Sequence, residues 1–345
     1  MMKKRISDRS NLIFRVYVIG YSERGESILV LFTDKGEEDR IIYSIVIDSF
    51  KYKGEHKTID IMNEYNLKEK KIDMLIWSHP DYDHTYGLNE IINNYCSEKT
   101  QVVLPYDLNG EAWNKVDYNK EDKDLVNKIL QLTEREYKSH DTANVSDYLY
   151  HPLVDITLED GLGILPISIW ALSPHSTRIN YLLEKHATMH KNDLSISLMV
   201  GIGKDNANKF LFFADVENDD VDLLYPQAFE EPHFVKIPHH GSSSTDLLPQ
   251  KLVCPPSKLP VACTTIYKSQ KLPEIDVLKK YCSVFQQVDC TGRSNAKTIN
   301  YGYAQYDFDL YDTQRVNVKH YGHAKTVDAQ YLKDLGKLIP QKVKP

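Results

Sequence analysis

A short segment, WSHPDYDHTYGL, places four side chains that can bind a metal within a span of six residues: His79, Asp81, Asp83 and His84. Side chains alternate in an extended segment, so positions 79 and 81 point to the same side. Their imidazole nitrogens and carboxylate oxygens can bind one or two divalent cations. The structural alternative is a set of turn caps, because Asp and His are common in turns. The segment is therefore either a metal site or a structural cluster.

Two further segments favour the metal site. FLFFADVE ends an apolar run at Asp215, and HFVKIPHHGSSS ends another at the pair His239 and His240. A lone Asp after a strand is often a helix cap, but an adjacent His pair before Gly is unusual. Loops at the carboxyl ends of strands are where α/β folds keep their sites. The three segments together therefore predict one set of ligands.

The elements that must position these segments alternate between strands and helices. Apolar runs rich in β-branched and aromatic residues predict strands. They fall at 12–20, 26–32, 41–48, 72–77, 101–105, 167–174, 194–202, 209–217, 233–244, 260–267, 284–291 and 301–311. Helical spacing occurs at 58–69 and 274–282, and places Leu88, Ile91, Ile92 and Tyr95 on one helix face. The pattern predicts an α/β protein with helices packed on a sheet.

Two regions do not follow this alternation. Residues 106–160 are polar and contain one amphipathic segment, DKDLVNKILQLTEREY, which predicts a mostly helical insertion. Residues 315–345 carry six Lys against two Asp and are interpreted as a basic tail. The expected organisation is one domain, 1–314, with the insertion at 106–160 and the tail at 315–345.

Composition limits the classes of function. The 345 residues are 41% hydrophobic and 26% charged, without an apolar run of membrane-spanning length. Five cysteines without a CxxC pair favour reduced thiols, so we expect a cytoplasmic protein without a membrane partner. The net charge of −7 disfavours tight duplex binding by the whole surface. It leaves open a local basic groove, with Lys236, Lys268, Lys271, Arg293 and Lys297 as candidates.

The order of the segments VIGYSERGESILVLF, YSIVID, SHPDYDHTYGL, ALSP, NDLSISL, FLFFADVE and KIPHHGSSS resembles the metallo-β-lactamase fold. Within that superfamily the chain is most similar to the branch of the ComEC nuclease domain. That branch has HxDxDH where most members have HxHxDH. The resemblance covers roughly residues 12 to 310. It implies an αββα sandwich with a two-metal hydrolase site along one edge, and phosphodiesterases acting chiefly on DNA.

Carried over by position, the resemblance assigns most of these residues to two metals. His79 and Asp81 would bind the first metal, and Asp215 would bridge both. The ligands implied for the second are Asp83, His84 and His239.

Other positions are implied around these ligands. Asp48 would orient them from below, and Asn192 and Ser195 match the NxxS motif. His240 and Ser242 would lie close to the substrate phosphate.

The chain also departs from the pattern of that branch. Phe50 stands where a Gly usually follows ID-S/T. The later YGHP is replaced by YKSQKLP, so the His expected near the substrate is missing. Lys268 could replace it in catalysis, and Lys271 could contact the phosphate. These departures concern the substrate more than the metals.

The chemistry that follows is hydrolysis by two cations sharing a bridging hydroxide, which needs no Ser or Cys nucleophile. Asp83 and His240 are the expected catalytic groups beside Lys268. Three Asp ligands favour Mn²⁺ or Mg²⁺, with Zn²⁺ still open. The leading hypothesis is a metal-dependent phosphodiesterase or nuclease with DNA as substrate.

Several alternatives remain open at this point. The same metals could serve hydrolysis of a non-phosphate ester, a lactone, a thioester or a β-lactam, although HHGSSS argues against this. The substrate could be a nucleotide signal, or the chain could be a defence effector that a partner protein activates through 106–160. A non-catalytic module that keeps its metal for stability is the last alternative.

Overall fold

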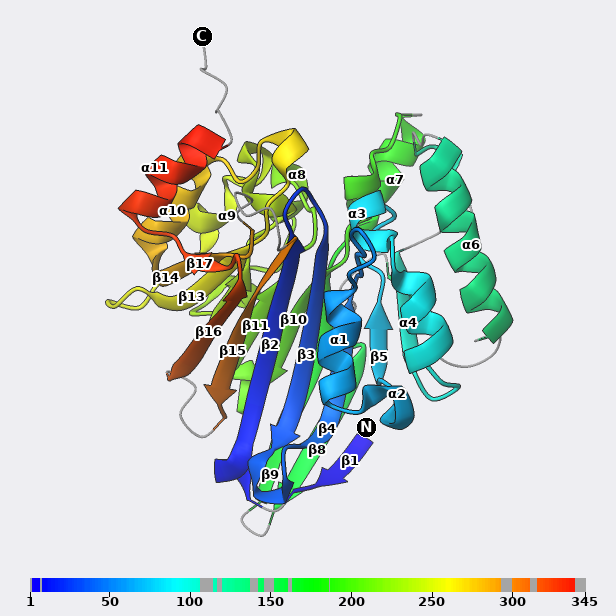
Figure 1. The fold of residues 1–345 in the computed structure, drawn as a ribbon, viewed down its shortest axis with the longest axis vertical. Helices are drawn as coiled ribbons and strands as arrows, with labels where there is room; N and C mark the ends of the chain where they lie inside the picture. The colour runs from blue at the N-terminus through cyan, green and yellow to red at the C-terminus, as the bar shows by residue number, and fades with distance from the viewer. Residues whose placement is uncertain are drawn as a thin grey trace.

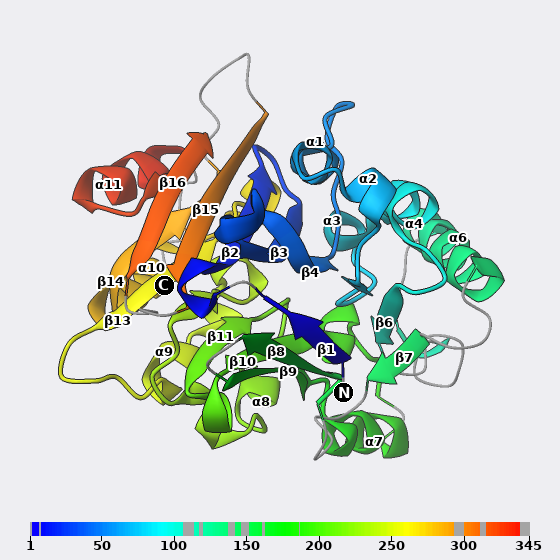
Figure 2. The ribbon, with the colours of Figure 1, turned by 90° about the horizontal axis from the view of Figure 1, so that it is seen from below.

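The computed structural model describes residues 2–6, 8–105, 114–116, 120–136, 142–145, 152–160, 163–185, 187–292, 300–310 and 315–338. Two mixed β-sheets pack face to face, and helices cover their outer faces (Figures 1 and 2). The αββα sandwich predicted from the sequence is confirmed.

The first sheet has the strand order β16-β15-β2-β3-β4-β5-β6-β7. Its strands are β2 (Leu12–Tyr21), β3 (Glu26–Asp34), β4 (Arg40–Ile47), β5 (Met74–Ile76), β6 (Gln101–Pro105), β7 (Thr142–Val145), β15 (Tyr301–Asp309) and β16 (Val316–Gly322). Strands β15, β2, β3 and β4 are antiparallel neighbours, whereas β4, β5, β6 and β7 run parallel.

The second sheet has the order β1-β8-β9-β10-β11-β12-β13-β14-β17. Its strands are β1 (Met2–Arg5), β8 (Val154–Asp160), β9 (Gly163–Ser173), β10 (Ser197–Ile202), β11 (Asn208–Phe212), β12 (Phe234–Lys236), β13 (Leu259–Thr264), β14 (Phe285–Cys290) and β17 (Lys325–Thr326). Strands β11 to β14 are parallel. Both sheets therefore present the carboxyl ends of parallel strands, where α/β proteins build sites.

Alternation along each strand divides the apolar side chains between two cores. In β2, Phe14 and Val16 belong to the core between the sheets, whereas Tyr17 and Ile19 belong to the core under the outer helices. Strands buried on both faces need near-continuous apolar sequence, which explains the run LIFRVYVIG, whose one charged residue, Arg15, is paired with Asp307 at 2.6 Å. Strand β2 therefore packs against the other sheet on one face and against the outer helices on the other.

Helices cover both outer faces (Figure 1). Those on the first sheet are α1 (Lys57–Glu64), α2 (Leu67–Lys70), α4 (Leu88–Tyr95) and α6 (Lys120–Glu136). Those on the second are α8 (Asn218–Val221), α9 (Leu248–Lys251), α10 (Ile275–Val284) and α11 (Ala329–Leu338). The apolar face predicted at Leu88, Ile91, Ile92 and Tyr95 is buried in α4. None of the described helices combines the length and apolarity needed to cross a bilayer.

The region expected as an insertion is more varied than predicted. Helix α6 forms where the amphipathic segment predicted it. In addition, β7 adds a strand to the first sheet and β8 adds a strand to the second. The side chains of α6 that pack inward are Val126, Ile129 and Leu130. Most other residues of 106–160 lie outside the described part of the chain, as do Arg293 and Lys297.

The segment expected as a basic tail is part of the sandwich, which corrects that interpretation. Strand β16 pairs with β15, and β17 pairs with β14. The buried carboxylate of Asp289 ties them together. It accepts hydrogen bonds from Tyr306 Oη and Thr326 Oγ1, both at 2.8 Å, and pairs with His320 Nε2 at 3.0 Å. Counting Lys residues could not reveal a buried carboxylate 26 residues upstream of the expected boundary at 315.

Candidate metal centre

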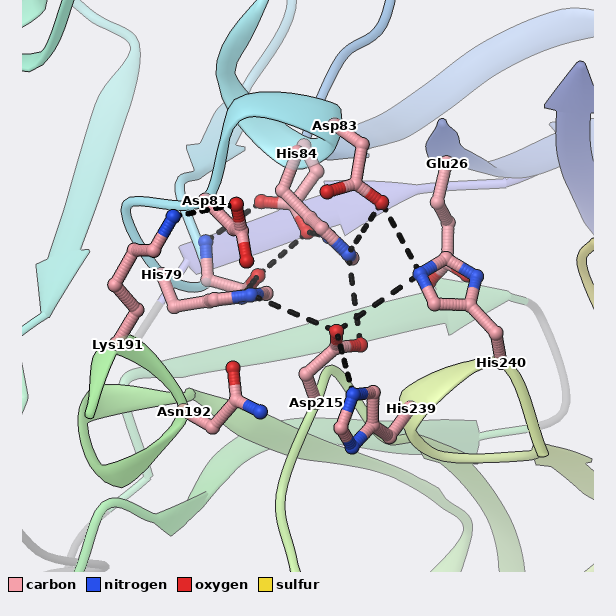
Figure 3. A network of polar contacts seen from close by, with 12 residues as sticks. Glu26, His79, Asp81, Asp83, His84, Lys191, Asn192, Asp215, His239 and His240 are labelled. Atoms are coloured by element: carbon pink, nitrogen blue, oxygen red, sulfur yellow. Dashed lines mark hydrogen bonds and ion pairs between the residues drawn. The ribbon is translucent and has the colours of Figure 1, made fainter. Parts of the chain in front are cut away.

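Four loops that follow parallel strands bring the candidate ligands together (Figure 3). Asp48 follows β4, and His79 follows β5. In the other sheet, Asp215 follows β11 and the pair His239 and His240 follows β12. The candidate centre therefore lies where the carboxyl ends of the parallel strands of both sheets meet.

Local backbone geometry aims the side chains inward. Asp81 is the N-cap of the short helix α3 (Tyr82–Thr85), and its carboxylate accepts the Tyr82 N–H at 2.7 Å. This helix brings Asp83 and His84 inward, where both are buried. His239 and His240 have φ angles of 44° and 49°, the left-handed region that costs energy for side chains other than Gly. That backbone turns two adjacent imidazoles towards different parts of the centre.

Asp48 lies beneath the centre and orients a histidine. Its carboxylate accepts Ser78 N–H at 2.7 Å and Ser78 Oγ–H at 2.5 Å, and its Oδ2 lies 2.7 Å from His84 Nδ1. Ser78 Oγ in turn lies 3.0 Å from His79 Nδ1. Holding Nδ1 leaves Nε2 of both rings facing the centre, an arrangement typical of metal-ligating histidines.

The groups that face the centre lack hydrogen-bond partners. Five residues contribute buried polar atoms without one: His79 Nε2, both carboxylate oxygens of Asp83, His84 Nε2, Asp215 Oδ1 and His240 Nε2. Each such atom costs free energy, about 1–3 kcal/mol for an ordinary polar group and more for a charged one. Converging orphaned atoms of imidazole and carboxylate are the donors that a divalent cation needs.

The charges of the centre are also unbalanced. Asp48, Asp83 and Asp215 are all buried, and every ion pair that they form within the described residues is with a histidine. A buried carboxylate is stable only when it is paired or bound to a metal. The donor set therefore fits divalent cations.

The pKa values of these groups respond to one another. Burial raises the pKa of Asp215, but the charges of His84, His239 and His240 outweigh burial and hold that pKa well below its usual range. For His84, burial is outweighed by Asp215 and Asp48, which raise its pKa well above the usual value. Burial, together with the charge of His84, holds the pKa of His79 well below normal. The opposite shifts of Asp215 and His84 follow from their mutual attraction in a buried site.

Two groups of possible ligands can be distinguished. The inner group is Asp83, His84 and His240, whose ligand atoms lie within 4.8 Å of one another and are all buried. The outer group is His79 and Asp81. Asp215 lies between them: its Oδ1 is 3.5 Å from His84 Nε2, and its Oδ2 is 3.8 Å from His79 Nε2. The carboxylate of Asp215 therefore faces both groups.

The histidine pair differs from its expected arrangement. His240, expected near the substrate, completes the inner group, with Nε2 at 3.2 Å from Asp83 Oδ2. His239, expected at the second metal, has Nε2 at 3.9 Å from Asp215 Oδ2 and Nδ1 at 3.4 Å from Glu217 Oε1. The sequence could not separate two adjacent imidazoles, because the left-handed backbone decides which one enters the centre.

A buried network that the sequence did not reveal supports His240. Its Nδ1 lies 2.6 Å from Thr265 Oγ1, which donates to Glu26 Oε2 at 2.6 Å. Lys236, fully buried, pairs with Glu26 Oε1 at 2.6 Å. Lys236 was a candidate for a basic groove, and its burial corrects that prediction. The signal in the sequence was a Lys inside the apolar strand HFVKIP.

The outer group already has a cation from the protein. Lys191 Nζ lies 2.7 Å from Asp81 Oδ1 and 3.0 Å from Asp122 Oδ2 of α6. The Asp81 side chain is 26% exposed, in contrast to the buried inner group. Lys191 therefore connects the centre to the helix of the expected insertion.

The remaining predicted residues surround the centre at various distances. Asn192 Nδ2 donates to Glu217 Oε1 at 3.3 Å, and Ser195 is buried with its Oγ lacking a hydrogen-bond partner. Ser242 caps its own turn through the Ser244 N–H. Lys268 pairs with Glu23 at 3.1 Å, and Lys271 is exposed. Neither lysine contacts the inner or outer group.

Comparison with known proteins gives similarity of fold. No protein-family model and no curated protein matches the sequence at a significant level. Among solved structures, the metallo-β-lactamase fold protein YhfI from Bacillus subtilis is similar over 86% of this chain and 99% of its own, with 11% identity and a TM-score of 0.39.

Two metallo-β-lactamases are also similar. Rm3 matches over 61% of this chain and 64% of its own, with 13% identity and a TM-score of 0.30. GOB-18 from Elizabethkingia meningoseptica matches over 66% and 73%, with 14% identity and a TM-score of 0.25.

Proposed function

We propose that this chain is a metal-dependent hydrolase of the metallo-β-lactamase superfamily that cleaves phosphodiester bonds, with DNA as its expected substrate. One observation carries the proposal: the orphaned buried atoms of His79, Asp83, His84, Asp215 and His240 converge on one centre. When bound there, divalent cations would activate water and offset the charge that develops at phosphorus.

The residues of the chain would have distinct tasks. Asp83, His84 and His240 would hold the inner cation, and Asp215 would face both cations. His79 and Asp81 would hold the outer one. Asp48 and Thr265 would keep the imidazoles of His84 and His240 turned inward through their Nδ1 atoms. The carboxylates of Asp81, Asp83 and Asp215 would make a hard, anionic set of donors, which favours Mn²⁺ or Mg²⁺ over Zn²⁺ alone.

The proposal is tested with the full chain stripped of metal. Mn²⁺, Mg²⁺ or Zn²⁺ is restored, and cleavage of single-stranded DNA, duplex DNA, RNA and bis(p-nitrophenyl) phosphate is measured. A chromogenic β-lactam and a lactone test the competing hydrolases. Asp83→Ala is the matched control, and metal content is measured in parallel.

Cleavage of a phosphodiester that depends on metal and is lost in Asp83→Ala is the expected result. Hydrolysis of the lactone or β-lactam alone would overturn the proposal. Metal bound without any hydrolysis would favour a module that keeps its metal for stability.

A partner-activated form of the same function is favoured by Lys191. Its ammonium pairs with Asp81 and with Asp122 on α6. A protein that binds to α6 could therefore draw Lys191 away from Asp81 and leave the Asp81 carboxylate to the outer cation. In this form the isolated chain binds metal but is slow, and Lys191→Met raises its activity. Unchanged activity in Lys191→Met would remove this form of the proposal.

A further inference from the structure

Arg24 lies beside the candidate metal centre, in the turn between β2 and β3. Its guanidinium lies over the ring of Tyr82, 4.5 Å from the centroid, and it interacts electrostatically with Tyr267. Tyr82 stands in α3 between Asp81 and Asp83. The Tyr267 ring packs edge-on against His240, with centroids 5.3 Å apart and an interplanar angle of 87°. Arg24 therefore joins the two walls of the centre that carry Asp83 and His240.

The turn that carries Arg24 is fixed by Phe50, the residue that departs from the pattern of the resembling branch. Gly25 has a φ of 107°, and a Cβ at Gly25 would lie 2.0 Å from the Phe50 ring. Phe50 also packs against Tyr82 and Tyr86, with centroids 6.0 and 6.1 Å away. Tyr82 and Tyr86 stack on each other at 5.0 Å. This aromatic base positions Arg24 before any substrate arrives.

The charge of Arg24 is available, unlike that of the neighbouring cations. Lys191 pairs with Asp81, Lys236 with Glu26, and Lys268 with Glu23. Within the described part of the chain, Arg24 forms no such ion pair, and it is only half-buried. Burial lowers the pKa of Arg24, but Tyr267 and the negative charge of Asp83 outweigh burial and raise it.

We propose that Arg24, with Tyr267, binds the phosphate of the substrate at this centre. The inference rests on the proposed function and names a residue for it. Guanidinium presents donors in its plane while one face rests on an aromatic ring, and it matches two phosphate oxygens at once. This specifies an anionic phosphodiester, in preference to a neutral ester or lactone, and takes over the role expected of Lys268 and Lys271.

The test compares Arg24→Ala and Arg24→Lys with Lys53→Ala. Lys53 is a matched control because its exposed ammonium lies over Tyr52, 5.1 Å from that ring, and Tyr52 stacks on Phe50. KM and kcat are measured on a thymidine oligonucleotide with Mn²⁺. Binding of inorganic phosphate to the metal-loaded proteins is measured by calorimetry, and metal content and Tm are recorded.

Arg24→Ala is expected to weaken phosphate binding and raise KM by about 10–100-fold, as loss of a charge-assisted bond predicts, with metal content unchanged. The phosphate affinity and KM of Arg24→Lys should fall between those of Arg24→Ala and those of the native chain. Lys53→Ala should have the native phosphate affinity and KM. If Arg24→Ala is too unstable by Tm, Arg24→Lys decides. Phosphate binding equal to native in the folded Arg24 variant, or equally weakened by Lys53→Ala, overturns the inference.

The two proposals fail in distinguishable ways. If the native chain cleaves no phosphodiester, the proposed function fails, and phosphate calorimetry still decides the role of Arg24. If cleavage is robust and the Arg24 variants bind phosphate as the native chain does, only the Arg24 inference fails.

Discussion

The inner and outer groups of the candidate metal centre differ in how their charge is balanced. The inner group is fully buried, and its unpartnered atoms face one another. The outer group includes Asp81, which is partly exposed and already paired with Lys191. The difference indicates that the inner group requires a cation for its own stability, whereas the outer group has a protein cation competing with the metal. We therefore expect two unequal metal affinities.

The largest effect is expected from the charge pair behind the inner group. Glu26→Gln leaves Lys236 buried without its partner, so the free energy of unfolding should fall by about 3–5 kcal/mol. The double variant Glu26→Gln, Lys236→Met should recover most of the loss. Asp122→Asn, at the more exposed pair behind the outer group, should cost no more than about 1 kcal/mol. Chemical denaturation measures the free energy of unfolding of all three variants. Equal losses of stability at the two charge pairs would contradict the proposed difference between the inner and outer groups.

Asp83→Asn and Asp81→Asn compare the two groups directly. Asp83→Asn should lower activity about 100-fold or more and remove the tighter metal, since it alters a buried ligand. Asp81→Asn should lower activity less and leave the tighter metal bound, because Asp81 is partly committed to Lys191. Metal titration and steady-state kinetics provide the measurements. A greater loss at Asp81 would reverse the assignment of the groups.

Asp220, in the acidic cluster around Arg178, allows a test through pH. Burial, together with the charges of Asp193, Asp219 and Glu217, raises its pKa to about 7 against the effect of Arg178. The folded state then holds a proton that the unfolded state has lost, so stability falls as pH rises from about 4 towards 7.

Asp220→Asn should flatten this fall in stability. At pH 8 it should stabilise the chain by roughly 2 kcal/mol, less than the full shift would give. Thermal or chemical unfolding across pH measures it. A native and a variant curve that run parallel from pH 4 to 8 would show that Asp220 has an ordinary pKa.

The smallest effect is expected at Lys191. Lys191→Met removes the competing ammonium, so binding of the weaker metal should tighten by roughly tenfold, with the tighter metal unchanged. Lys185→Met, an exposed lysine over Tyr181, is the control. Calorimetric titration separates the two binding events. Weaker binding in Lys191→Met would mean that Lys191 holds Asp81 in place for the cation.

Much of the fold followed from the sequence because its signals are local. The run LIFRVYVIG and the spacing of Leu88, Ile91, Ile92 and Tyr95 identify their elements through periodicity alone. The position of β16, β17 and α11 in the sandwich was not predictable, because it depends on partners such as Asp289 that are distant in the sequence.

The candidate site divides in the same way. The clustering of His79, Asp81, Asp83 and His84 is visible in the sequence because one short loop carries them all. The choice of His240 over His239 depends on two left-handed φ angles, and the pairing of Lys191 with Asp81 depends on a contact 110 residues apart. Arg24 was hidden because only the folded turn places it beside Asp83 and Tyr267.

The pairing of β15 with β2 has a consequence for the order in which the chain can fold during synthesis. Phe308 lies opposite Phe14, so the hydrogen bonds along that edge of β2 cannot form until β15 and all the intervening strands have been synthesised. Until then β2 presents an unpaired apolar edge of the kind that invites aggregation. The newly made protein therefore reaches its native sandwich only after translation has passed β15. We expect a chaperone to bind the exposed edge of β2 during synthesis.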